Sequence, residues 1–247
     1  MDLQLRGKTA LITGASKGIG AATAAGLARE GCDVVLVARG LDDLERQAGV
    51  IRAAADVEVT VLAADLSRPD EATRVAAACP WIDILVNNAG AIPGGTLAEI
   101  DDAAWRAAWD LKVFGYINLC RAFYPGMTAR GGGVMINVIG AGANAKSAGY
   151  ICGAVGNAAL ETFTQTLGRA SPKDGIRVVG VHPGPVATDR LKSLARQTKG
   201  GLDFSAMAFG RPAEPQEIGA AVAFLASPLS AYISGTIISI DGGATAT

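Results

Sequence analysis

The sequence has little of the residue types that metal sites and histidine-based catalysis need. Its 247 residues include a single histidine, His182, and four cysteines that lie far apart at Cys32, Cys79, Cys120 and Cys152. One histidine argues against a histidine-based catalytic triad and leaves a zinc site without its usual ligands. Widely spaced cysteines are typical of free, buried thiols in a reducing compartment. We therefore expect no metal.

The sequence also lacks any block of like charge and any long hydrophobic run. Its 22 basic and 23 acidic residues give a formal net charge of −1, which argues against a nucleic-acid surface or a polybasic membrane patch. No run is long enough to span a bilayer. Residues 1–16 have neither the basic start nor the apolar core of a signal peptide. We therefore expect a cytoplasmic protein that binds neither nucleic acid nor membrane.

What the sequence does contain is a glycine-rich turn between a strand and a helix. The run TGASKGIG, Thr13 to Gly20, follows a short apolar β-type run, Thr9 to Ile12. It opens an alanine-rich helical run that continues to Arg29. Its three glycines allow tight backbone angles and a close approach of a ligand, and the free N–H groups of the helix favour an anion. The turn therefore predicts a phosphate-binding site.

Strand and helix patterns alternate along the whole chain, which is typical of a parallel sheet covered on both faces. We expect one α/β domain over residues 1–247. The strands that we expect are Thr9–Ile12, Asp33–Ala38, Glu58–Ala64, Ile82–Asn88, Val134–Ile139, Ile176–Val181 and Thr236–Ile240. The main helices that we expect between them start at the glycine turn, at Leu41 (to Ala54), near Pro69, at Asp101 (to about Arg121), around Gly153 and at Glu214 (to Leu225).

Several spaced motifs accompany the glycine turn in a fixed order. They are Asp65-Leu66, NNAG at 87–90, HPGPVATD at 182–189 and IDGG at 240–243. With these motifs the chain resembles the short-chain dehydrogenase/reductase family over essentially its full length. The resemblance implies a Rossmann-type, doubly wound fold with a seven-stranded parallel sheet, and NAD or NADP across the carboxyl ends of the strands. The cofactor-binding residues that it implies are Gly14, Ser16, Lys17, Gly18, Ile19, Gly20, Arg39, Asp65, Leu66, Asn87, Ala89, Gly90, Pro183, Gly184, Val186 and Thr188.

The choice between NADP and NAD depends on the charge at the end of the second strand. An acidic residue there would bind the adenosine ribose of NAD and repel a 2′-phosphate. Here the strand ends in Val37-Ala38-Arg39, without an acid. Arg39 can bind a phosphate, and Lys17 in the glycine turn can add a second cation. We expect NADP, with NAD less favoured; the alternative is that both cations are merely solvated surface residues.

The positions that carry catalysis in this family hold other residues here. The family uses a Ser, a Tyr, a Lys four residues after the Tyr, and an Asn on the central helix. Aligning the elements places Gly140 at the Ser position, Gly153 at the Tyr position, Asn157 at the Lys position and Lys112 at the Asn position. Asn and Lys are thus exchanged between two helices. Tyr150 is followed four residues later by alanine, so no Tyr-x-x-x-Lys pair is restored.

The candidate catalytic residues are accordingly Lys112, Tyr150 and Asn157, with Ser147 and Asn137 as lesser candidates. Asn157 can bond the nicotinamide ribose, Lys112 can lower the pKa of a nearby acid, and the phenol of Tyr150 can be that acid. If this exchange compensates, Lys112 must lie near Asn157. The alternatives are a packed Lys112 stem with a solvated ammonium, and a packed aromatic ring at Tyr150.

Gly140 and Gly153 leave a hollow where the family has the side chains of Ser and Tyr, and Gly156 follows in the same helix. Gly153 and Gly156 each cost a helix about 1 kcal/mol relative to alanine, which suggests that either the space or a close approach of another group is needed there. Either a bulkier substrate enters the hollow, or Tyr150 folds into it, or the site has lost redox chemistry. The leading hypothesis is an NADP-dependent oxidoreductase for an alcohol/carbonyl pair. The alternatives are a catalytically silent NADP-binding sensor or scaffold protein and, less favoured, a lyase or isomerase.

Two further expectations follow from the resemblance. The irregular segment Leu191–Gly210 occupies the family's substrate-covering region and predicts a lid of moderate apolarity, unless it is only a surface loop. Small residues along the helix after Gly153 permit close packing between helices, which is consistent with a homodimer or homotetramer. They are Ala154, Ala158, Thr162 and Thr166.

Overall fold

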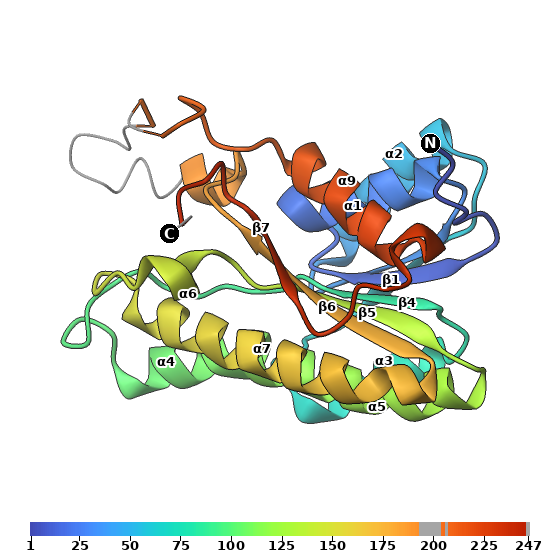
Figure 1. Ribbon diagram of the computed structural model, residues 1–247, viewed down its shortest axis with the longest axis horizontal. Coiled ribbons are helices and arrows are strands. Elements are labelled where there is room, and N and C mark those ends of the chain that lie inside the picture. The colour runs from blue at the N-terminus through green and yellow to red at the C-terminus, as the bar shows by residue number, and fades with distance from the viewer. Residues whose placement is uncertain (193–203, 206, 246–247) are drawn as a thin grey trace.

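The computed structural model describes residues 1–192, 204–205 and 207–245. Within them, seven strands form one sheet in which every neighbouring pair is parallel (Figure 1). The strands are β1 (Thr9–Thr13), β2 (Asp33–Ala38), β3 (Val59–Ala63), β4 (Ile84–Asn87), β5 (Gly133–Val138), β6 (Ile176–Pro183) and β7 (Ile237–Ile240). The expected seven-stranded parallel sheet is confirmed, with strand ends displaced by at most two residues.

The strand order places the glycine turn at the centre of the sheet. The order is β3-β2-β1-β4-β5-β6-β7, so the chain winds outward from β1 in one direction and then returns to β4 to wind in the other. The loops that follow β1 and β4 therefore diverge from adjacent strand ends. In sheets of this kind the crevice at such a point is where ligands bind.

Helices cover both faces of the sheet (Figure 1). One face carries α1 (Gly18–Arg29), α2 (Leu41–Ala54) and α9 (Pro215–Ala226), whose buried side chains form one apolar cluster with the strands. The other carries α3 (Pro69–Ala78), α5 (Gly115–Ala129) and α7 (Ile151–Ala170) over a second cluster. The shorter elements are α4 (Asp102–Trp109), η1 (Asp110–Phe114), α6 (Gly142–Ala145), η2 (Ser171–Asp174) and η3 (Pro228–Ser230). Burial on both faces explains the nearly continuous apolar strands.

The central helical region is longer than the expected helix from Asp101 to about Arg121 and is interrupted by a π-helical segment. It runs as α4, the π-helical segment η1 and α5, and it ends at Ala129 with Pro125 inside α5. The predicted end was wrong because Phe123 and Met127 are buried in the core, and this packing carries the helix through the proline. The π-helical turn changes the direction of the side chains on η1, and such turns often occur at functional sites.

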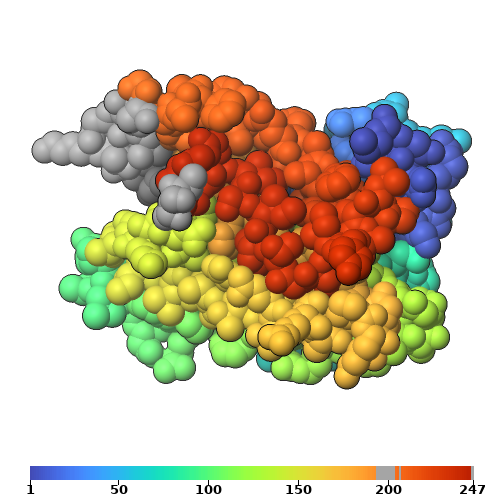
Figure 2. All heavy atoms as spheres, in the orientation of Figure 1, coloured from blue at the N-terminus to red at the C-terminus, as the bar shows by residue number. Residues whose placement is uncertain are grey.

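In the space-filling view the C-terminal part of the chain, in orange and red, lies next to α7, in yellow (Figure 2).

The segment that was expected to form a lid is described only in part. Its residues 193–203 and 206 lie outside the described residues. All four cysteines are buried and unpaired. No described helix has both the length and the apolarity that a membrane crossing needs.

Candidate functional site

The glycine turn has the geometry of an anion-binding loop. Gly14 and Gly18 have positive φ angles of 65° and 56°, a conformation that glycine adopts readily. A Cβ atom at Gly20 would stand 2.6 Å from Nδ2 of Asn88, so only glycine fits there. The first turn of α1 contains no acidic residue and no side-chain cap. Its N–H groups and the positive end of its dipole are therefore open to a phosphate.

Hydrogen bonds between β1 and the end of β4 fix this turn. The hydroxyl of Thr13 accepts from the backbone N–H groups of Asn88, at 2.8 Å, and Ala89, at 3.0 Å. The side-chain amide of Asn88 donates to the carbonyl of Thr13 at 2.9 Å. Asn88 belongs to the NNAG motif, but the motif alone did not indicate this bracing role. The two loops that diverge at the sheet centre are thus held as one unit.

Two adjoining cavities lie along the carboxyl ends of the strands. The larger, which we call the central cavity, has a volume of about 770 Å³, and the smaller, the side cavity, about 400 Å³. They share Gly14, Lys17, Ala89 and Gly90. Other predicted residues that line the central cavity are Gly18, Ile19, Lys112, Tyr150, Asn157, Pro183, Gly184 and Thr188. Ser16, Arg39 and Leu66 line the side cavity.

Four predicted cofactor residues line neither cavity: Gly20, Asp65, Asn87 and Val186. The fully buried amide of Asn87 donates to Oδ1 of Asn137 at 2.9 Å. Asp65 accepts from the backbone N–H and the hydroxyl of Ser67, and Val186 is buried. In this structure the side chains of Asn87 and Asp65 therefore bond to other protein groups rather than face either cavity. Asn137 is likewise buried, and Ser147 is exposed outside both cavities.

The segment after β6 closes over the glycine turn. A Cβ atom at Gly18 would lie 3.1 Å from the Thr188 methyl carbon, so these two positions, far apart in the chain, touch. Pro183, Gly184 and Thr188 line the central cavity from this side. The motif at 182–189 and the glycine turn therefore form two walls of one site.

The two predicted phosphate-binding cations differ in their environments. Arg39 is exposed, lines the side cavity and has no hydrogen bond or ion pair among the described residues. Lys17 forms an ion pair with Asp43 at 2.8 Å, and Asp43 also pairs with Arg46 at 2.5 Å. These two cations hold the pKa of the Asp43 carboxyl below its ordinary value. Arg39 is thus free for a ligand, whereas Lys17 already has a partner.

Lys112 is buried in the central part of the site. Its ammonium nitrogen donates to the carbonyl of Ile139 at 2.5 Å and to Oδ1 of Asn157 at 2.9 Å. A Cβ atom at Gly90 would lie 3.0 Å from Cδ of Lys112, so glycine at 90 makes room for the lysine stem. Burial, helped by the positive charge of Arg190, lowers the pKa of Lys112 to about 7. The alternative of a solvated ammonium is wrong.

Asn157 joins this lysine to the loop after β5. Its Nδ2 donates to the carbonyl of Gly140 at 3.3 Å. Gly156, one residue earlier, faces the ring of Trp109, whose Nε1 would be 3.3 Å from a Cβ at 156. The small residue lets α7 approach α4 and η1 closely enough for Lys112 and Asn157 to bond directly. The predicted proximity of Lys112 and Asn157 is confirmed, while their catalytic roles stay predictions.

Tyr150 fills the hollow left by Gly153. A Cβ atom at Gly153 would stand 2.5 Å from the Tyr150 hydroxyl oxygen, and one at Gly142 would stand 3.0 Å from the Tyr150 ring. Of the alternatives for this hollow, the structure shows the one in which Tyr150 folds into it. Burial raises the pKa of the Tyr150 phenol, while the charge of Arg190 and a hydrogen bond from its guanidinium act against this rise.

Arg190 is a site residue that the sequence interpretation missed. Its guanidinium donates to the carbonyls of Gly90 at 3.4 Å and Ile92 at 2.5 Å, across the central cavity that it lines. The expected cation beside Tyr150 was Lys112, but the charge that acts on the phenol is that of Arg190. Its place directly after the motif at 182–189 was the available signal.

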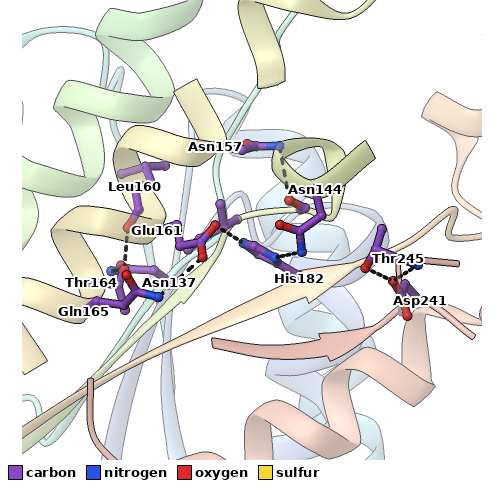
Figure 3. Close-up of polar contacts among 12 residues, drawn as sticks. Asn137, Asn144, Asn157, Leu160, Glu161, Thr164, Gln165, His182, Asp241 and Thr245 are labelled. Atoms are coloured by element: carbon purple, nitrogen blue, oxygen red, sulfur yellow. Dashed lines mark hydrogen bonds and ion pairs between the residues drawn. The ribbon is translucent and has the colours of Figure 1, made fainter. Parts of the chain in front are cut away.

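His182 lies behind the site rather than in it. Its ring is buried between Asn144, at 3.4 Å from Nδ1, and Glu161, at 3.9 Å from Nε2 (Figure 3). Burial lowers the pKa of His182, although Glu161 opposes this change. His182 does not line either cavity. It therefore serves the packing behind the loop after β5.

Together these features place a glycine turn with open N–H groups at one end of the central cavity and a phenol, a buried amine and a guanidinium at the other. Such an arrangement suits an elongated ligand with phosphate groups, whose far end meets a proton donor and two cationic side chains.

Comparison with known proteins assigns the chain to a family. Residues 14–245 match the family described as enoyl-(acyl carrier protein) reductase. Galactitol 2-dehydrogenase (L-tagatose-forming) of Cereibacter sphaeroides is 32% identical over 98% of this chain and 96% of its own length. L-sorbose reductase of Gluconobacter frateurii, solved with NADPH and L-sorbose, is 35% identical with a TM-score of 0.94, covering 100% of both chains. A solved structure described as a short chain dehydrogenase/reductase family protein is 35% identical with a TM-score of 0.91, again covering 100% of both. The chain therefore belongs to the short-chain dehydrogenase/reductase family.

Proposed function

We propose that this protein is an NADP(H)-dependent oxidoreductase that interconverts an alcohol and a carbonyl compound with a non-standard catalytic site. The observation that carries the proposal is the Tyr150 phenol, which fills the hollow of Gly153 and lines the same cavity as the glycine turn. A proton donor thus shares one cavity with a dinucleotide-binding loop. This combination is what reduction of a carbonyl by a nicotinamide requires.

The residues present fit NADP. The glycine turn offers open N–H groups to the pyrophosphate, and Arg39, which has no ion pair among the described residues, offers a guanidinium to the 2′-phosphate in place of an acid. The related L-sorbose reductase was solved with NADPH. The bound cofactor supplies the hydride. The protein must then hold the carbonyl compound, exclude water and deliver a proton to its oxygen.

Tyr150 is the proposed proton donor. At the wall of the central cavity its hydroxyl can bond a carbonyl oxygen and pass it a proton as negative charge develops there. The nearby Arg190 guanidinium stabilises the phenolate that this transfer leaves. Lys112 adds positive charge beside the loop after β5, and Asn157 holds that lysine in place.

This assignment departs from the family at four positions. Gly140, Gly153, Asn157 and Lys112 stand where the family has Ser, Tyr, Lys and Asn. In this proposal Tyr150 supplies its phenol from one turn earlier, and the positive charge comes from η1 and from the segment after β6. The site thus keeps a phenol and a positive charge, although other positions in the chain supply them.

Spectrophotometric oxidation of NADPH with a broad panel of aldehydes and ketones tests the proposal. We expect turnover by the wild type and a loss of roughly a hundredfold or more in Tyr150→Phe, with NADPH binding retained. Tyr232→Phe is the matched control, because Tyr232 is fully exposed. If the wild type binds NADPH but none of the carbonyl compounds causes its oxidation, the result would instead favour the silent sensor or scaffold.

We further propose that the protein forms a homodimer or homotetramer. An apolar groove between α5 and α7 supports this proposal. It is lined by Ile117, Cys120, Arg121, Tyr124, Pro125, Phe163 and Leu167. Light scattering coupled to gel filtration measures the mass directly, and a single species of 25.0 kDa would contradict the proposal.

A further inference from the structure

The central cavity contains more positive than negative charge. Arg190 and Lys112 both line it, and neither forms an ion pair with a carboxylate among the described residues. Within the described ranges Lys112 is bonded only to neutral groups, the Ile139 carbonyl and the Asn157 amide. Arg190 is likewise bonded to the neutral carbonyls of Gly90 and Ile92. A guanidinium and an amine that is cationic once protonated therefore face one space without a counter-ion in the described part of the chain.

The other charged groups of this cavity are already paired. Asp189 is the one carboxylate among its described lining residues, and it pairs with Lys192 at 3.5 Å. Lys17, at the opposite end, pairs with Asp43. The unmatched charge is thus confined to the end of the cavity where Tyr150 lies.

Arg190 and Lys112 repel each other, and this repulsion contributes to the lowered pKa of Lys112. An anion bound at this end would relieve the repulsion and accept charge-assisted hydrogen bonds from the guanidinium. The guanidinium is well placed to do so, because two backbone carbonyls hold it across the cavity. Pre-positioning of this kind reduces the entropy lost when a ligand binds.

We propose that the carbonyl substrate carries a carboxylate, which Arg190 binds at the Tyr150 end of the central cavity with Lys112 as a second positive charge. This inference rests on the proposed function, since it assigns the substrate class of that same site. Arg190 and Tyr150 line the same cavity, and the guanidinium is close enough to act on the Tyr150 phenol, so one molecule meets both only if few bonds separate its carboxylate from its carbonyl. The substrates are therefore short oxo acids and the corresponding hydroxy acids.

Paired substrates test this directly. NADPH oxidation is measured with 2-oxo-, 3-oxo- and 4-oxopentanoate and with their methyl esters, which lack the charge. In the wild type at least one acid should exceed its ester roughly tenfold to a hundredfold in kcat/KM, mainly through KM. Arg190→Met should bring the acid-to-ester ratio of kcat/KM close to one. Arg190→Lys should retain part of the preference for the acid, because lysine keeps the positive charge but cannot form the paired hydrogen bonds of a guanidinium to a carboxylate.

Two controls keep the result specific. Lys192→Met removes a neighbouring exposed cation that already pairs with Asp189, and it should keep the acid-to-ester ratio of the wild type. NADPH affinity is measured in Arg190→Met as well. A loss of NADPH affinity as large as the loss of acid preference would assign Arg190 to the cofactor phosphates and overturn the proposal.

A binding measurement does not depend on turnover. Calorimetric titration of 3-hydroxypentanoate into the NADPH complex, in two buffers of different ionisation enthalpy at pH 8, reports the protons taken up. The carboxylate should favour the charged form of Lys112, so uptake approaches one proton in the wild type and disappears in Lys112→Met. Because His182 lies close enough to act on the Lys112 charge, the variant is what assigns the proton to Lys112.

The outcomes separate the two proposals. If acids and esters are reduced equally well, the carboxylate site is wrong while the oxidoreductase assignment stands. If no carbonyl compound is reduced but the hydroxy acid binds more tightly than its methyl ester with proton uptake, the carboxylate site stands and the proposed reaction fails.

Discussion

The hydroxyl oxygen of Tyr150 lies 2.5 Å from the point that a Cβ atom of residue 153 would occupy, so Tyr150 and any side chain at 153 exclude each other. Tyr150 precedes α7 as its N-terminal flanking residue, and Gly153 belongs to the first turn of that helix. The phenol thus enters the cavity from just outside the helix, and the missing side chain at 153 is what admits it.

Gly153→Ala should therefore lower turnover by roughly a hundredfold, because even one methyl group displaces the Tyr150 ring from the cavity wall. NADPH binding should remain within a few-fold of the wild type, since the glycine turn is untouched. Steady-state kinetics and cofactor titration measure both quantities. Gly149→Ala is the matched control, because a Cβ there would meet its nearest atom at 3.8 Å. Equal turnover in the two variants would contradict a role for Tyr150 in this place.

Lys112→Met should lower turnover by roughly a hundredfold while leaving NADP binding largely intact. Methionine keeps much of the apolar volume of the buried stem but removes the charge and the hydrogen bond to Asn157. Comparison of kcat, KM and the NADP dissociation constant with those of the wild type checks the prediction. Unchanged turnover would remove Lys112 from the catalytic machinery.

Lys112 should also make stability depend on pH. Its pKa is about 7 in the folded protein, below the ordinary value of 10.5, so the unfolded chain binds more protons between these values. The free energy of unfolding therefore rises with pH across this window, by at most about 1.4 kcal/mol per pH unit. Urea unfolding at pH 7.5 and 9.5 should show this gain in the wild type and in Lys173→Met, where an exposed lysine is removed, but not in Lys112→Met.

Arg39→Ala should weaken NADP binding at least tenfold and leave NAD binding nearly unchanged, because the 2′-phosphate is the group that distinguishes the two. Fluorescence titration of both dinucleotides tests this in the wild type and the variant. Arg106→Ala, which removes an exposed arginine on α4, should change neither affinity. Equal affinities of the wild type for NADP and NAD would contradict the proposed cofactor preference.

Asp43→Asn should strengthen NADP binding roughly threefold to tenfold. Asp43 lines the side cavity and holds Lys17 at 2.8 Å, so it competes with a 2′-phosphate for that cation. Its removal frees Lys17 and also lowers the negative charge in the cavity. The same titrations measure the change, with Asp70→Asn as the control because Asp70 pairs with the exposed Arg68 outside both cavities. Weaker NADP binding would mean that Asp43 positions Lys17 rather than competing for it.

Local patterns in the sequence were sufficient for the fold and for the geometry of the glycine turn. Strand and helix periodicity reflects burial on one or both faces, so the seven strands could be placed within two residues. The glycine turn was readable because its backbone angles and close contacts are properties of the glycines themselves. The proximity of Lys112 and Asn157 was also predictable, since each position follows from the register of its own helix.

Only the tertiary structure decided which groups meet at the other end. Arg190 reaches Gly90 and Ile92, which are about a hundred residues away in the chain, and no local pattern records such a contact. Likewise, the ion pair between Lys17 and Asp43 joins two residues that are distant in the sequence. Pro125 does not end α5, because the burial of its neighbours outweighs the local cost of a proline in a helix. The sequence predicts which helix, strand or loop carries a charged residue. It does not predict which groups that residue contacts, because the direction of a side chain depends on packing between distant elements.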